Sequence, residues 1–198
     1  MSKYNAFYAQ SGGVTAVINA SAAGVISTLQ EKYADKIDKI YAGNNGILGA
    51  LEDDLFLVTE KLDLAKLKQT PGGFFGSCRH KLKSIEQDKA QYEKILATFK
   101  KYDIRYFFYN GGGDSQDTAY KVSQISEQLG YPVICIGVPK TVDNDLPHTD
   151  TCPGFGSVAK YVAISTLEAS LDVASVQHLN QGIYFRSNGA PCRLDCCS

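Results

Sequence analysis

The sequence predicts an α/β protein built on a doubly wound, mainly parallel sheet. Short apolar stretches that suit strands alternate with segments of helical spacing, and several of these strands run directly into glycine-rich turns. Of the 198 residues, 44% are apolar, which is enough for one sizeable core. Parallel strands end along one rim of such a sheet, and open α/β sheets bind ligands there.

The first strand is expected over residues 3–9, which alternate in polarity and are rich in aromatic residues. Ser11, Gly12 and Gly13 break it, and apolar spacing predicts a helix over residues 14–29. This order aims backbone N–H groups and the positive helix end at one spot, which suits an anion. The alternative is an ordinary structural turn, because glycine commonly supplies only a positive φ.

Short strands are expected at residues 39–42 and 56–61, followed by a polar helical turn at 62–68. Residues 71–79 form a glycine-rich loop that ends in Arg79, whose guanidinium presents a fixed fork of donors that matches phosphate oxygens. The alternative is a flexible loop with a solvated arginine.

An amphipathic helix over residues 85–101 leads to an apolar strand at 104–109, and helical spacing resumes over 116–129. The junction between them consists of Asn110, Gly111, Gly112, Gly113, Asp114 and Ser115. Asp114 either caps the helix, a routine role for aspartate, or holds a divalent cation beside a phosphate. Spacing alone slightly favours capping.

A buried strand is expected at residues 133–138, and Pro139 ends it because proline cannot donate to a ladder. The next six residues, at the carboxyl end of this strand, offer two carboxylates, an ammonium, a hydroxyl and an amide. They are Lys140, Thr141, Val142, Asp143, Asn144 and Asp145. A polar surface turn is the alternative, and the phosphate-binding parts in other loops weaken it.

A long helix is expected at residues 158–174, with Val162, Leu167 and Leu171 inside. After about residue 176 the pattern becomes irregular, and we expect poor order there. Three of the six cysteines lie in this tail: Cys192, Cys196 and Cys197. They indicate zinc only weakly, because a structural zinc needs four ligands.

Composition excludes several classes of protein. The chain has 20 basic and 21 acidic residues, so no global field favours nucleic acid or an anionic membrane. The start of the chain lacks a signal-peptide pattern, and no apolar stretch reaches membrane-spanning length, so we expect a soluble protein. Cys78, Cys135 and Cys152 are scattered, as free thiols are in a reducing compartment such as the cytoplasm.

Five loops together resemble the phosphofructokinase family, in family order, and most closely its pyrophosphate-dependent branch. They are residues 11–13, 72–79, 111–115, 139–145 and 153–157. The resemblance covers residues 3 to about 175, roughly the amino-terminal half of a family member. It implies a Rossmann-like donor-binding domain and the start of a second domain over residues 1–175. Residues 176–198 do not match, and the chain looks truncated with an unrelated tail.

The resemblance also implies roles for individual residues. Arg79 matches an arginine that reaches the transferred phosphoryl group, and Asp143 matches the general base that takes a proton from the sugar. Asp145 matches a second carboxylate that supports the cation or the base. Residues similar to those that bind the donor phosphates are Gly12, Gly13, Gly112, Gly113 and Ser115. Residues that match the segment touching the sugar phosphate are Thr141, Val142 and Asp143.

Two residues bear on the phosphoryl donor, because the ATP branch has glycine where this chain has Asp114 and Lys140. An aspartate there would repel and block the inner phosphates of a nucleotide, and a lysine would compensate charge on a pyrophosphate leaving group. In one departure, Gly113 stands at the family's usual metal-binding aspartate. Either Asp114 takes over the Mg²⁺ or Mg²⁺ is held differently.

The implied activity is that of a cytoplasmic transferase of glycolysis, a kinase that moves a phosphoryl group reversibly from pyrophosphate to fructose 6-phosphate with Mg²⁺. Lys140 and Arg79 would neutralise the developing charge. The full-length family is expected to form homo-oligomers and to bind neither nucleic acid nor membrane. The family's methionine-glycine-arginine sugar-phosphate motif is absent after about residue 175, so we expect this chain alone to be inactive. A non-catalytic phosphate-binding half-domain and an ATP-dependent 6-phosphofructokinase are the alternatives.

Overall fold

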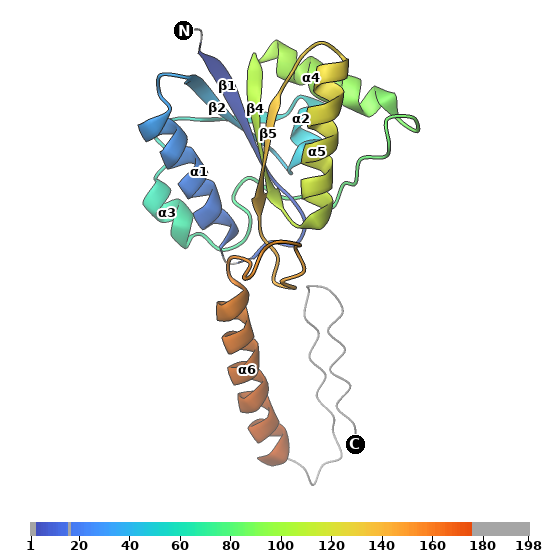
Figure 1. Cartoon of the computed structure of the whole chain (residues 1–198). Helices are drawn as coiled ribbons and strands as arrows, with labels where there is room; N and C mark the ends of the chain where they lie inside the picture. The colour runs from blue at the N-terminus through green and yellow to red at the C-terminus, as the bar shows by residue number, and fades with distance from the viewer. Residues whose placement is uncertain (1–2, 16, 176–198) are drawn as a thin grey trace. The chain divides into compact units, whose positions relative to one another are not determined.

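The computed structural model describes residues 3–15 and 17–175 (Figure 1). The chain divides into two compact units, residues 1–140 and 141–198, and each is considered by itself. The elements of the first unit are β1 (Tyr4–Gln10), α1 (Ile18–Lys32), β2 (Ile37–Gly43), α2 (Ile47–Glu52), β3 (Leu55–Val58), α3 (Leu64–Gln69), α4 (Lys89–Lys101), β4 (Ile104–Gly111), α5 (Gly113–Gln128) and β5 (Ile134–Pro139).

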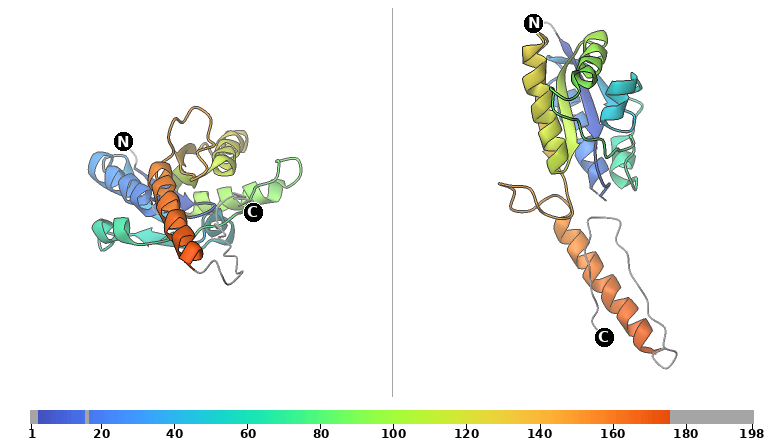
Figure 2. Two further views of the ribbon diagram at one scale, coloured as in Figure 1. Left: turned by 90° about the horizontal axis from the view of Figure 1, so that it is seen from below. Right: turned by 90° about the vertical axis from the view of Figure 1, so that its right-hand side faces the viewer.

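The first unit is a five-stranded sheet of order β3-β2-β1-β4-β5 with helices on both faces. The neighbours of β1 are both parallel to it, β5 is parallel to β4, and β3 alone among these strands runs antiparallel to its neighbour. Figure 2 shows the same layers from two further directions. The predicted α/β class and mainly parallel sheet are therefore confirmed.

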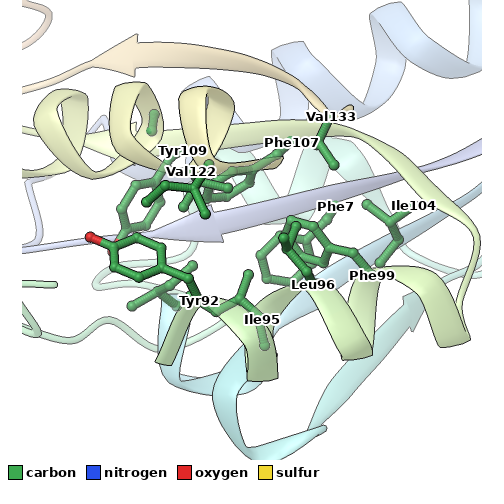
Figure 3. Close-up of a cluster of buried hydrophobic side chains, with 14 of the residues drawn as sticks. Phe7, Tyr92, Ile95, Leu96, Phe99, Ile104, Phe107, Tyr109, Val122 and Val133 are labelled. Carbon is green, nitrogen blue, oxygen red and sulfur yellow. The ribbon is translucent and has the colours of Figure 1, made fainter. Parts of the chain in front are cut away.

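Alternation along β1 divides the core into two layers, because successive side chains of a strand point to opposite faces. Phe7 faces α2, α4 and α5, and its ring centroid lies 5.2 Å from that of Phe99 and 5.3 Å from that of Phe107. Figure 3 shows this cluster around the β1 strand. Ala6 and Tyr8 point the other way, toward α1 and α3. The β1 side chains that point into the two layers are fully buried. The strand is therefore a rigid support for the turn that follows it.

Several predicted boundaries are wrong. The first helix begins at Ile18 rather than residue 14, and Val14 is exposed. The fourth helix begins at Lys89 rather than residue 85, because Asp88 caps it by accepting a hydrogen bond from Gln91 N at 3.3 Å. The strand expected at residues 56–61 is the shorter β3, and α2 was not predicted, because only a turn was read at residues 43–46.

The prediction of a buried strand at residues 133–138 is wrong in its burial. The fifth strand lies at the edge of the sheet formed by the described strands, and Ile134 and Ile136 are 57% and 41% exposed. These two side chains border an apolar groove of about 800 Å³ that α1 closes on its other side. Pro139 is the last residue of the strand, still opposite Gly111, since an edge strand tolerates a missing donor.

The second unit, as far as it is described, consists of an irregular loop and α6 (Phe155–Ser175). The predicted long helix is confirmed, but none of its residues is buried, so the expectation that its apolar residues lie inside is wrong. Within the described part of the chain, no helix is long and apolar enough to cross a membrane. The expectations for residues 176–198, including the weakly indicated zinc site at Cys192, Cys196 and Cys197, lie outside the described residues.

Candidate functional site

Three strands of the first unit end level with one another. Gln10 of β1 is paired with Asn110 of β4, and Asn110 is paired with Val138 of β5. The turns that follow β1 and β4, and the loop that follows β5, therefore leave the sheet along one rim. This rim is the carboxyl edge of the parallel strands, where α/β sheets commonly bind ligands.

Two cationic groups lie against the Gly12–Gly13 turn. A Cβ atom added to Gly12 would lie 3.3 Å from Nζ of Lys140, and one added to Gly13 would lie 3.1 Å from Nη2 of Arg79. Gly12 also has a φ of +75°, which L side chains rarely adopt. The structure thus brings together four residues that the sequence predicted for the site, and glycine at both turn positions lets an ammonium and a guanidinium approach the backbone.

The turn is fixed to the glycine-rich loop that carries Arg79. Gly12 N donates to the carbonyl of Cys78 at 2.9 Å, and Ser77 Oγ donates to the carbonyl of Gly12 at 2.7 Å. The N–H of Gly12 is therefore already bonded within the protein. Because α1 begins only at Ile18, the prediction that this turn runs directly into a helix end is wrong. An anion at this turn would therefore interact chiefly with the side chains of Lys140 and Arg79.

The second glycine junction leads directly into α5. Gly112 is its N-cap, makes no side-chain capping bond, and accepts backbone bonds from Ser115 and Gln116 at 3.0 and 3.1 Å. The first N–H groups of a helix have no intrahelical partner, and they favour an anion. Gly111 is required here, because a Cβ would lie 2.0 Å from Oγ of the buried Ser115.

The Asp114 side chain pairs with Lys81 and does not cap the helix. Asp114 Oδ1 lies 2.7 Å from Lys81 Nζ, and both side chains are largely exposed, at 72% and 65%. The hydrogen bond that Lys81 donates to Asp114 raises the pKa of Lys81. The slightly favoured capping role is thus wrong. Lys81 was missed by the sequence analysis; its only signal is its position two residues after Arg79.

At this junction the first unit presents one exposed carboxylate, that of Asp114. Across the residues that the structure describes, no group of three or more His, Cys, Asp or Glu side chains gathers to hold an ion. Mg²⁺ usually keeps several waters and is bound by one or two carboxylates together with substrate phosphates. Asp114, in the first turn of α5, fits that donor set, whereas Gly113 has only backbone to offer.

The other predicted site residues belong to the second unit. Asp143 N donates to Oγ1 of Thr141 at 3.1 Å, and the carboxylates of Asp143 and Asp145 are exposed. Between them, Asn144 has a φ of 52°, and its side-chain Oδ1 accepts from Cys152 N at 2.7 Å. This bond joins two ends of the loop, and Val142 is half-buried. The roles of these residues toward a sugar stay predictions.

A family model described as Phosphofructokinase matches residues 5–180. Two curated relatives named pyrophosphate–fructose 6-phosphate 1-phosphotransferase, from Halomonas elongata and Methylococcus capsulatus, are 64% and 61% identical over 178 residues. These matches cover 89% of this chain and 42% of each relative. The crystal structure of a pyrophosphate-dependent phosphofructokinase from Marinobacter aquaeolei is 62% identical with a TM-score of 0.78, over 89% of this chain and 43% of that one. The chain thus spans less than half the length of the proteins it matches.

Proposed function

The chain belongs to the phosphofructokinase family, and we propose that it is the donor-binding part of an enzyme that transfers a phosphoryl group from pyrophosphate to fructose 6-phosphate. The observation that carries the proposal is the pair of cations, Arg79 and Lys140, against the Gly12–Gly13 turn. The names of the two relatives, both above 60% identity, support the choice of pyrophosphate and of the sugar. The product would be fructose 1,6-bisphosphate, in glycolysis.

In this reaction the protein mainly positions the reactants and stabilises charge. The guanidinium fork of Arg79 would bind the oxygens of the transferred group, and the Lys140 ammonium would neutralise the leaving phosphate. The first N–H groups of α5, at Gly113 and Asp114, would bind a further phosphate oxygen. Asp143 would accept the proton of the attacking hydroxyl and so make it a better nucleophile.

The same residues support pyrophosphate over a nucleotide. Asp114 is exposed in the first turn of α5. Its charge and bulk would oppose binding of a nucleotide, whose phosphate chain continues beyond the transferred group. Lys140 would neutralise the negative charge of the leaving group, which with pyrophosphate as donor is an inorganic phosphate. In a complete enzyme, replacing both residues with glycine is therefore expected to admit ATP. A double variant that still prefers pyrophosphate would contradict this account of the donor.

Mg²⁺ is part of the proposal, with Asp114 as its protein ligand beside the phosphate oxygens. When bound, it would neutralise charge on the pyrophosphate oxygens. A cytoplasmic location and a homo-oligomer of the full-length protein also stay predictions. The free thiols of Cys78, Cys135 and Cys152 support a reducing compartment.

The test adds the part of a relative that lies beyond the matched segment. Residues 1–175 are joined to the remaining carboxyl-terminal part of the Halomonas elongata relative, and formation of fructose 1,6-bisphosphate is measured with pyrophosphate and with ATP. We expect turnover with pyrophosphate, and a loss of kcat of roughly a thousandfold in Asp143→Ser, as removal of a general base produces. Asp150→Ser, which removes an exposed carboxylate from the same loop, is the matched control and is expected to change kcat less than about twofold. An unaltered forward rate in Asp143→Ser would remove the base assignment.

A second function remains for the chain as it stands, namely non-catalytic phosphate binding. It is favoured by length, since the chain covers 42% of its curated relatives. A coupled assay on the 198 residues is expected to give no turnover, while calorimetry detects binding of pyrophosphate. Turnover by the chain alone would exclude the non-catalytic alternative, and tight binding of ATP in place of pyrophosphate would favour the ATP-dependent branch.

A further inference from the structure

A buried chain of side-chain hydrogen bonds runs beneath the rim of the first unit. Its first side chain, counted from β5, is that of Asn110, the residue of β4 that lies level with the ends of β1 and β5. The Tyr8 hydroxyl donates to Asn110 Oδ1 at 3.0 Å, and Asn110 Nδ2 donates to the carbonyl of Val138 at 2.8 Å. Asn110 and Tyr8 are completely buried. These two bonds fix the last part of β5 to the centre of the sheet through side chains, in addition to the backbone ladder.

The chain continues from Tyr8 to α1. Gln10 Nε2 donates both to the Tyr8 hydroxyl, at 3.4 Å, and to Oδ1 of Asn19, at 3.2 Å. Gln10 and Asn19 are also completely buried. The hydroxyl of Tyr8 therefore both accepts and donates, and burial raises the pKa of Tyr8, which keeps the proton it donates.

From Asn19 the chain reaches the glycine-rich loop. Asn19 Oδ1 accepts a bond from Phe74 N at 2.9 Å, and Asn19 Nδ2 donates to the carbonyl of Thr70 at 2.8 Å. One side chain thus fixes the start of the loop at two points. The hydrogen-bonded chain runs without interruption from the glycine-rich loop, through α1, β1 and β4, to the end of β5.

Each end of this chain of bonds lies on a segment that leads to one of the two cations. Val138 is two residues before Lys140, whose own N–H is bonded to the carbonyl of Gly111 at 3.1 Å. Phe74 begins the part of the loop that ends in Arg79. We propose that Tyr8, Gln10, Asn19 and Asn110 are positioning residues that set the distance between the Arg79 and Lys140 cations on either side of the Gly12–Gly13 turn. This inference rests on the proposed pyrophosphate site for its function, and on the hydrogen bonds alone for its geometry.

Burial is the reason that such a chain can set a distance. In a low-dielectric interior a hydrogen bond is stronger, and a member left without its partner is costly, so each group is held to one arrangement. Arg79 is exposed and sits on a loop that is held to the Gly12 turn through Ser77 and Cys78 and to α1 through Phe74. Two cations must match the spacing of two phosphate groups, and an error of about 1 Å in such a site costs much of its effect.

The test uses the 198-residue chain with Tyr8→Phe, which removes one hydroxyl and keeps the ring. The matched control is Tyr131→Phe, because the buried Tyr131 also donates to a carbonyl, that of Phe99 at 3.2 Å, and it lies before β5, at the opposite end of that strand from the rim. Amide hydrogen exchange is measured at Phe74 and Lys140, one at each end. We expect exchange roughly tenfold faster at both amides in Tyr8→Phe and within about twofold of the parent in the control.

A second variant tests whether the bonds act as one chain. Asn19→Ser removes the acceptor that holds Phe74, and we expect it to accelerate exchange at Lys140 as well. Faster exchange at Phe74 alone would overturn the proposal, since the two ends would then be independent. Equal effects of Tyr8→Phe and Tyr131→Phe on both amides would overturn it too.

Binding of pyrophosphate, measured by calorimetry, tests the functional part. We expect Tyr8→Phe to weaken binding about fivefold in the parent chain and not at all in a Lys140→Met background, because the substitution acts through the placement of that lysine. The same fivefold loss in both backgrounds would mean a general loss of structure and would contradict the proposal. If the parent chain binds no pyrophosphate while the exchange results hold, the proposed donor fails and the positioning chain stands.

Discussion

The chain leaves β1 and β4 through similar glycine turns but enters the next helix differently. After β4, α5 begins at Gly113, directly on the turn, and no side chain caps it. After β1, the N–H of Gly12 is bonded to Cys78, and α1 begins only at Ile18. At the β4 junction, backbone N–H groups are available to an anion. At the β1 junction, the available groups are two cations, which can approach because glycine has no side chain.

The difference teaches that one sequence signature supports two local arrangements, each with positively polarised groups that would suit an anion. At the β4 junction glycine is needed for packing, since Gly111 lies against the Ser115 side chain. At the β1 junction it is needed for a positive φ and for access by Lys140. The start of α4 differs from that of α5, because there the side chain of Asp88 accepts a hydrogen bond from Gln91 N. The predictions below separate these causes.

The largest effect is expected at the β4 junction from Gly111→Ala. The new methyl group would lie 2.0 Å from Oγ and 2.5 Å from Cβ of the buried Ser115, so the backbone of β4 or α5 must move. We expect a loss of about 3 kcal/mol in the free energy of unfolding, measured by urea titration. Gly24→Ala is the control, because nothing lies within 4 Å of its added Cβ and it sits inside α1, where alanine is expected to stabilise by about 1 kcal/mol. Equal stability of the two variants would refute the packing argument.

A smaller loss of stability is expected at the β1 junction. Gly12→Ala places a side chain at a φ of +75°, which costs about 1 kcal/mol, and it crowds Nζ of Lys140. We expect pyrophosphate binding, measured by calorimetry, to weaken roughly tenfold, the loss of one charge-assisted contact. Gly13→Ala provides the contrast, since Gly13 does not have a positive φ and its added methyl would meet only the flexible end of Arg79. If Gly13→Ala weakened binding more than Gly12→Ala, the greater weight given to the positive φ of Gly12 would be wrong.

The smallest effect is expected from Lys81→Met, which leaves Asp114 unpaired on α5. An exposed ion pair contributes little to stability and is screened by salt. Any decrease in the midpoint temperature of thermal unfolding is therefore expected to vanish at about 0.5 M NaCl. Because Asp114 raises the pKa of Lys81 above its ordinary 10.5, the stabilisation is complete below pH 10.5 and is lost as the pH rises through the raised pKa. Lys66→Met is the control, because it also removes the lysine of an exposed ion pair, the one with Asp63. A loss that persists in high salt would contradict a purely electrostatic pair.

Local pattern was enough to predict the sheet and the rim. The alternating residues of β1 and the glycine turns identify the strands and their carboxyl ends, because side-chain period and turn chemistry are local properties. Lys81 and Asp114 are 33 residues apart, with α4 and β4 between them, so no spacing rule encodes their pairing. The start of α1 and the exposure of β5 depend on which segments pack beside them, so tertiary contacts decide them.

Among the described strands, the one at the middle of the sheet comes first in the chain. Asn5 of β1 must wait for Ile104 of β4, about a hundred residues later, before its second neighbour exists. On the ribosome, β1, β2 and β3 can assemble early, but the inner layer around Phe7 stays open until β4 emerges. Nascent chains of this protein are therefore expected to need chaperone protection during that interval. Pausing translation before residue 104 is expected to reveal this need.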